Sequence, residues 1–70
     1  MNESQLLIAV GQNIKKIRTQ KKMSQNKLAE ACRFEKASMS RIEAGKTNVT
    51  LLTLLKISTA LEVNVRDFFE

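Results

Sequence analysis

The sequence predicts an all-α fold, a compact bundle of five short helices. Along most of the 70 residues, apolar side chains recur at steps of three and four, which is the spacing of a helix with one buried face. The chain has no proline and only three aromatic residues, and this composition favours helix over sheet. A chain of this length is enough for one small hydrophobic core, so we expect a single domain over residues 1–70.

The first helix is expected to run from Ser4, its N-cap, to about Gln20. A serine hydroxyl accepts hydrogen bonds from the free N–H groups of a first turn. Gly11 lies inside this helix at a cost of about 1 kcal/mol relative to alanine. It either permits close contact with another helix or weakens the start of this one. The apolar stripe of the helix consists of Leu7, Val10, Ile14 and Ile17.

Between Ser24 and Gly45 the pattern predicts two short helices joined by a tight turn. Ser24 is a favourable N-cap, and Met23 and Leu28 stand at the spacing of a hydrophobic staple around it. The helical spacing then breaks and resumes near Lys36. Gly45 ends the second helix because glycine adopts the left-handed conformation without a Cβ penalty. The inward positions of the pair are Leu28, Ala29, Cys32, Met39 and Ile42.

A fourth helix is expected over about 51–62, capped by Thr50, and it is apolar on more than one side. A helix that is apolar on most sides is buried on most sides, which indicates contact with a second copy of the chain. A last helical turn follows, with Asn64 as its cap and Asp67 at the third position, as in a capping box. Two adjacent phenylalanines close this region and must face different ways. The residues expected at a dimer interface are Leu52, Phe68 and Phe69.

Positive charge is concentrated in the middle of the chain, whose formal net charge is +5. Residues 15–46 contain ten basic and three acidic side chains, a local balance of +7. The rest of the chain contains two basic and four acidic side chains, a balance of −2. A surface polarised in this way suits a polyanion. The alternative is a basic protein whose charges are simply solvated.

The residue types that enzyme chemistry and metal binding need are scarce. The chain has no histidine, no tyrosine and one cysteine, so acid–base, nucleophilic and metal-ligand sets are not expected. Cys32 is expected to act as a small buried apolar side chain. The longest apolar run, residues 6–10, is far shorter than the ~20 residues of a membrane span. We therefore expect a cytoplasmic protein that is not an enzyme and that uses no cofactor, metal or membrane.

Four short motifs follow one another between Gly11 and Phe69. They are MSQ at 23–25, LAE at 28–30, SRIEAGK at 40–46 and LLTLLK at 51–56. Together they resemble the Xre family of helix-turn-helix regulators, which includes the phage repressors and Cro, and they are similar to the small controllers of restriction–modification genes. The resemblance implies a lambda-repressor-like DNA-binding domain with its helix-turn-helix at about 24–45, and a core completed by helices within 51–69.

The second helix of the motif is the expected base-reading element. In helix-turn-helix proteins it enters the major groove, and its first residues contact base edges. The resemblance places base reading at Lys36, Ala37 and Arg41. The Arg41 guanidinium can form a bidentate contact with guanine O6 and N7, which discriminates against a wrong base by about 1–3 kcal/mol. Alternatively, Arg41 is solvated or pairs with Glu43 or Glu30. The full set of expected base contacts is Lys36, Ala37, Ser38, Ser40 and Arg41.

Contacts with DNA phosphates are expected around the motif. Gln25 opens its first helix, where free N–H groups attract phosphate, and the resemblance implies that this glutamine also braces the recognition helix. Arg18 and Glu43 match a basic and an acidic residue that pair in the family; the alternative is two unpaired surface charges. The expected backbone contacts are Arg18, Ser24, Gln25, Arg33, Lys46 and Asn48.

Three positions depart from the family pattern. Arg33 stands in the turn where the family usually has glycine, so the turn is either strained or shaped differently. Glu35 replaces the usual serine or threonine cap of the recognition helix. Glu62 replaces the glycine that often ends the fourth helix.

The predicted function is sequence-specific binding of double-stranded DNA by a small transcriptional regulator. One helix reads too few base pairs to select a site in a genome, so a homodimer on a (pseudo)palindromic operator is expected, as a repressor or autoregulator. The alternative is an antitoxin or another partner-binding protein, with a toxin or RNA polymerase as the partner and DNA binding secondary. A helical interaction module that does not need DNA is a further alternative.

Overall fold

Four α-helices and one short 3₁₀ helix form the computed structural model, which describes every residue from Met1 to Glu70. The predicted all-α bundle is confirmed, but the fifth helix is a 3₁₀ turn and not an α-helix. In chain order the elements are α1 (Glu3–Gln20), α2 (Gln25–Cys32), α3 (Lys36–Glu43), α4 (Leu51–Leu61) and η1 (Val65–Phe69).

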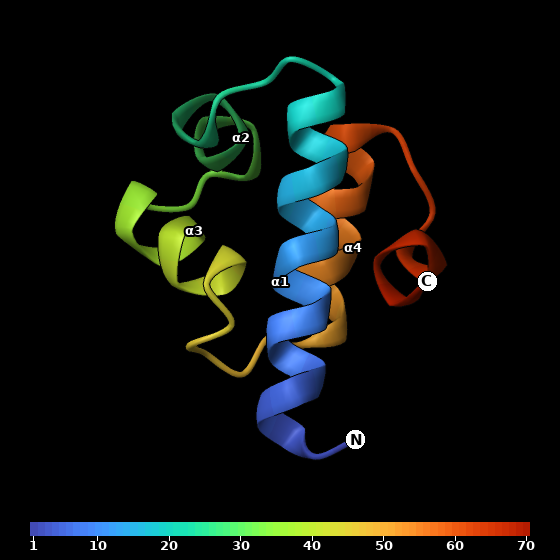
Figure 1. Cartoon of the computed structure of the whole chain (residues 1–70). Helices are drawn as coiled ribbons and strands as arrows, with labels where there is room; N and C mark the ends of the chain where they lie inside the picture. The colour runs from blue at the N-terminus through green and yellow to red at the C-terminus, as the bar shows by residue number, and fades with distance from the viewer.

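The long helix α1 is the element around which the others are arranged. In Figure 1 it runs through the middle of the molecule, with α2 and α3 on one side and η1 on the other. It packs against both α3 and η1, while α2 packs against α3 and α4. The helix-turn-helix pair and the end of the chain therefore lie against different faces of α1.

Every one of these elements contributes to a single hydrophobic core. All inward positions predicted for α2 and α3 are buried, and Val10 and Ile14 of the predicted α1 stripe are buried with them. Phe68 is fully buried, so the prediction that it contacts a second copy is wrong. The 3₁₀ turn directs its ring into the core and leaves the neighbouring Phe69 50% exposed. The core consists of Val10, Ile14, Leu28, Ala29, Cys32, Met39, Ile42, Leu54, Ile57, Leu61 and Phe68.

The start of α1 differs from the prediction. Its cap is Asn2 and not Ser4, because Asn2 and Gln5 form a reciprocal capping box. The Gln5 N–H donates to Asn2 Oδ1 at 2.9 Å, and the Asn2 N–H donates to Gln5 Oε1 at 3.0 Å. The other predicted hydroxyl caps are confirmed: Ser24 and Thr50 accept from main-chain N–H groups at 3.0 and 3.1 Å.

All four α-helices end in the same way, with one residue in the left-handed region. At the end of α2 the Arg33 N–H donates to the Glu30 carbonyl and the Phe34 N–H to the Ala29 carbonyl, the two bonds of a Schellman motif. Glycine, which adopts this conformation freely, occupies only one of the four positions. The left-handed residues are Lys22, Arg33, Gly45 and Glu62, with φ of 57°, 60°, 72° and 59°.

Close contact between α1 and α3 explains Gly11. A Cβ atom at this position would lie 2.5 Å from the Ile42 carbonyl oxygen and 2.6 Å from the Glu43 carbonyl oxygen. The first of the two predicted explanations for Gly11 is therefore correct. The contact sets the C-terminal end of α3 directly on the backbone of α1.

Candidate nucleic-acid interface

The outer face of α3 carries the predicted base-reading side chains. Lys36, Ala37, Ser40 and Arg41 are exposed, and Ser38 is half-buried at the edge of the face. The opposite side of the helix, with Met39, Ile42 and Glu43, is buried. Burial of one side fixes the rotation of α3 about its own axis, so all five predicted residues lie on or beside its solvent-facing surface.

Arg41 has no acidic partner. Its Nη2 donates only to Ser38 Oγ, at 3.4 Å, and the chain contains a single salt bridge, between Arg18 and Glu43. Pairing of Arg41 with Glu43 or Glu30, one of the two alternatives to base reading, is therefore not observed. The guanidinium of Arg41 stands in solvent with most of its donors free.

The inner side of α3 is held by a network around the Glu43 carboxylate. Arg18 Nε donates to Glu43 Oε2 at 2.7 Å, and Arg18 Nη2 donates to Oε1 at 3.0 Å. Gln25 Nε2 donates to the same Oε1 at 3.0 Å. The predicted ion pair is thus confirmed as a bidentate one, the strongest geometry for such pairs.

This network joins three elements at one buried point. The side chains of Arg18 and Glu43 are only 11% and 3% exposed, and Arg18 Nη1 also donates to the Met23 carbonyl at 2.8 Å. The end of α1, the turn after it, the start of α2 and the end of α3 are therefore fixed relative to one another. Three nitrogens of Arg18 donate inside the protein, so this side chain positions α3 and has little surface left for a phosphate.

The other predicted phosphate contacts lie at both ends of the motif and in the turn between its two helices. Ser24 is exposed and Gln25 half-buried at the start of α2, where free N–H groups face solvent. Lys46 and Asn48 are exposed in the loop between α3 and α4. Arg33 is exposed in the turn between α2 and α3, and its φ of 60° shows that the turn keeps the left-handed shape that glycine would adopt.

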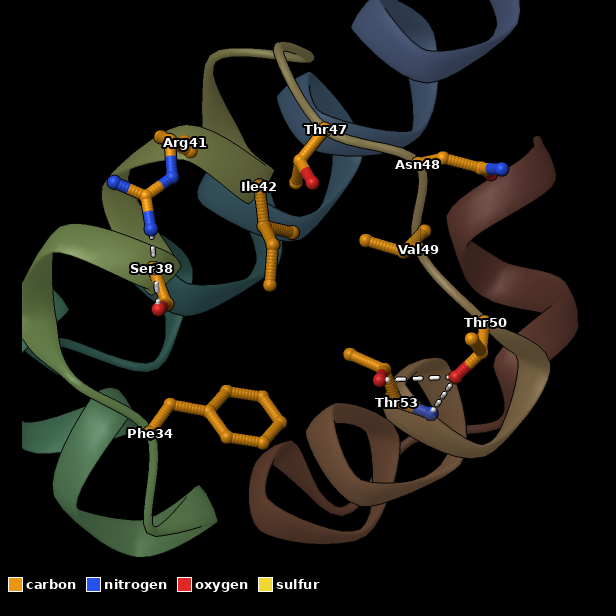
Figure 2. A pocket seen from close by; sticks show the side chains of 9 residues that line it. All are labelled: Phe34, Ser38, Arg41, Ile42, Thr47, Asn48, Val49, Thr50 and Thr53. Atoms are coloured by element: carbon orange, nitrogen blue, oxygen red, sulfur yellow. Dashed lines mark hydrogen bonds between the residues drawn. The ribbon is translucent and has the colours of Figure 1, made fainter.

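A hollow of about 220 Å³ lies between α3, the loop after it and the start of α4. Figure 2 shows the side chains of Phe34, Ile42 and Val49 pointing into this hollow from different sides, with the Thr53 side chain beside them. Ser38 and Arg41 from the outer part of α3 and Asn48 from the loop after it also line this hollow. Three threonines, Thr47, Thr50 and Thr53, complete the lining. The sequence indicated only Thr50 among them, as the cap of α4.

Cys32 lies in the core and has no reactive setting. Its side chain is buried, with Sγ 3.8 Å from the Lys56 carbonyl oxygen. Burial raises the pKa of the Cys32 thiol, and the positive charge of Lys56 opposes this only in part. The structure contains no group of three or more histidine, cysteine, aspartate or glutamate side chains that could hold a metal ion. None of its helices combines the length and the apolar character that crossing a membrane requires.

Comparison with known proteins identifies the family of this chain. Residues 14–68 match the helix-turn-helix family HTH_3. The chain is 43% identical over 61 residues to the control protein C.BamHI of Bacillus amyloliquefaciens, covering 86% of this chain and 75% of the relative. It is 36% identical over 63 residues to the control protein C.MunI of a Mycoplasma species, covering 89% of this chain and 85% of the relative.

The fold matches a solved controller protein as well. The crystal structure of the restriction–modification controller protein C.AhdI of Aeromonas hydrophila superimposes with a TM-score of 0.87 at 35% identity, covering 90% of this chain and 96% of that one. The chain belongs to the helix-turn-helix family HTH_3, the Xre-like family of DNA-binding transcriptional regulators, which are not enzymes.

Proposed function

We propose that this protein is a homodimeric controller of transcription that reads a (pseudo)palindromic operator with one copy of α3 in the major groove of each half-site. The observation that supports this is the outer face of α3: its polar side chains have no acidic partner, while its inner face is fixed by the Glu43 network. A rigid helix with free donors is what direct reading of base edges requires.

The proposed base contacts follow from the positions along α3. Arg41 binds guanine O6 and N7 with two donors, Lys36 binds guanine or a phosphate at the start of the helix, and Ala37 packs on a thymine methyl. Ser38 and Ser40 donate to or accept from neighbouring base edges.

The proposed phosphate contacts flank α3 on both sides. Ser24 and Gln25 place the N-terminus of α2 against a DNA phosphate. Lys46 and Asn48 contact the DNA backbone from the loop after α3. Arg33 contacts it from the turn before α3. Each cation that neutralises a phosphate steepens the slope of log K against log salt by about 0.9.

The proposed dimer uses an apolar face that the single chain leaves in water. On α4, Leu51, Leu52 and Leu55 are 75%, 72% and 52% exposed, and Phe69 on η1 is 50% exposed. Leu52 and Phe69 were expected there from the sequence; Leu51 and Leu55 join them. A second copy that covers these side chains would remove a large apolar area from water. It would also supply a second α3 helix for the other half-site.

The relatives indicate what such a regulator controls. Two are control proteins by name, and the C.AhdI structure is that of a restriction–modification controller. We therefore propose that this chain controls genes of a restriction–modification system, as a repressor or autoregulator. Since the relatives come from bacteria, whose DNA lies in the cytoplasm, that is the proposed place of action.

Selection of binding sites from random duplex DNA at near-physiological salt tests the proposal. Wild-type protein should select a palindromic consensus, and Arg41→Ala should relax one base position in each half-site. Arg66→Ala, which removes the same charge from an exposed position on η1, is the matched control and should select the wild-type consensus. Sequence-independent binding that disappears as salt rises, or an unchanged consensus for Arg41→Ala, would contradict the proposed reading.

A further inference from the structure

Asn13 ties the end of the chain to the middle of α1. Its Nδ2 donates to two main-chain oxygens, that of Phe68 at 2.8 Å and that of Glu70 at 3.1 Å. Both hydrogens of one amide nitrogen are therefore used on acceptors two residues apart. The residue between these two acceptors is Phe69, whose ring is the exposed apolar side chain of η1.

The C-terminal segment has few other restraints on the direction of Phe69. A 3₁₀ helix of five residues has poor hydrogen-bond geometry and little stability of its own. Its start is held by the Asn64 N–H, which donates to Asp67 Oδ2 at 3.1 Å, and its middle by the buried Phe68 ring. Beyond Phe68, the Asn13 amide supplies the remaining side-chain hydrogen bonds to the segment.

The same helix also holds the recognition helix. Gly11 lies directly against the carbonyl groups of Ile42 and Glu43, and Arg18 forms the bidentate pair with Glu43. α1 therefore lies between α3 and the segment that carries Phe69, as Figure 1 shows. The distance between the Phe69 side chain and α3 is therefore set by α1, which lies between them.

We propose that Asn13 is a positioning residue for dimerisation: its amide clamps the main chain on both sides of Phe69, so that this ring is presented to the second copy at a fixed distance from α3. This proposal rests on the proposed homodimer. Asparagine suits the role because its NH₂ group offers two donors to two main-chain oxygens, whereas aspartate of nearly the same shape offers none when ionised.

A double-mutant cycle on the dimer dissociation constant tests the clamp. Sedimentation equilibrium would compare the wild type, Asn13→Ala, Phe69→Ala and the double variant, at a temperature at which circular dichroism shows all four folded. Asn13→Ala should weaken the dimer about tenfold through loss of two hydrogen bonds, and Phe69→Ala should weaken it further. The double variant should be no weaker than Phe69→Ala, because the clamp acts through that ring.

Two variants and one DNA measurement separate positioning from general stability. Asn13→Asp should weaken the dimer at least as much as Asn13→Ala, whereas Gln12→Ala, a neighbouring exposed position, should leave it unchanged. Affinity for a duplex with one half-site should be the same for all variants, since α3 is untouched. The proposed clamp would be contradicted if Asn13→Ala dimerised with the wild-type dissociation constant, or if the effects of the two substitutions were additive in the double variant. A wild type that stays monomeric would overturn the proposed dimer itself.

Discussion

Glu43 shows how one buried residue can determine the orientation of a recognition helix. Its carboxylate is 3% exposed and accepts three donors from two other helices. The ion pair with Arg18 followed from matching both positions to a basic and an acidic residue that pair in the family. The resemblance also implied that Gln25 braces α3, and the structure shows this as a bond to the same oxygen. That partner atom could not be derived, since it depends on how α2 and α3 cross in space.

Replacing this carboxylate should be severe. Glu43→Gln would leave the Arg18 guanidinium, which is 11% exposed, facing a neutral amide, and removal of one partner of a buried pair costs about 3–5 kcal/mol. Urea denaturation should show a loss of this order in the free energy of unfolding. Glu35→Gln, at an exposed position that makes no side-chain capping bond, should stay close to wild type. Equal midpoints for the two variants would mean that the network does not stabilise the fold.

At the scale of the helices, hydrophobic spacing predicted the inward faces well, whereas boundaries depended on local chemistry. Leu28, Ala29 and Met39 are buried as predicted because a helix of known period has only one way to bury an apolar stripe. The start of α1 was misplaced because Asn2 with Gln5 offers a reciprocal cap that outcompetes a lone serine at Ser4. The role of Gly11 could be named only as one of two alternatives, because it depends on where α3 lies.

Gly11→Ala should destabilise the protein although alanine is the better helix former. Propensity alone predicts a gain of about 1 kcal/mol. The added methyl, however, would lie 2.5 Å from the Ile42 carbonyl oxygen, so α1 and α3 must separate. Thermal unfolding should give a lower midpoint, with Gln12→Ala on the exposed side of the same helix as the control at or above wild type. A raised midpoint for Gly11→Ala would show that the contact can relax freely.

Glu62→Gly should have the opposite effect on stability. Glu62 ends α4 with φ of 59°, a conformation that costs an L-residue about 1–2 kcal/mol. Glycine at this position should raise the free energy of unfolding by about 1 kcal/mol. Glu62→Ala removes the same charge but keeps the Cβ atom, so it should give no comparable gain. If both substitutions stabilise equally, the cause is the charge and not the backbone.

At the scale of the whole molecule, composition and charge indicated a basic helical bundle, and the structure adds where its unburied apolar surface lies. The sequence showed that α4 has too many leucines for one face, but the two phenylalanines of 68 and 69 could not be told apart. Their orientation depends on the 3₁₀ turn and on the two Asn13 bonds, which link residues 55 and 57 positions apart in the chain. Contacts between residues so far apart in the chain cannot be predicted from the spacing of apolar residues within one helix.

Leu52→Glu tests whether that surface joins two copies on DNA. Leu52 is 72% exposed, so a carboxylate there remains solvated in the single chain and should leave folding intact. In a dimer the same carboxylate would be enclosed among apolar side chains, where an unpaired charge is strongly disfavoured. Affinity for a single half-site should therefore be unchanged. Affinity for the full palindrome should fall by about 100-fold or more, since binding to both half-sites depends on two α3 helices being joined in one dimer.

Gln12→Glu makes the comparison specific to the α4 face. It adds the same negative charge at an exposed position on α1, so any general repulsion from DNA phosphates affects both variants alike. Gel-shift titrations of the two proteins on one-site and two-site duplexes give the four dissociation constants needed. If Leu52→Glu weakens both duplexes equally, it acts on α3 or on folding. If it weakens neither, the exposed leucines of α4 do not join the two copies, and a different partner covers them.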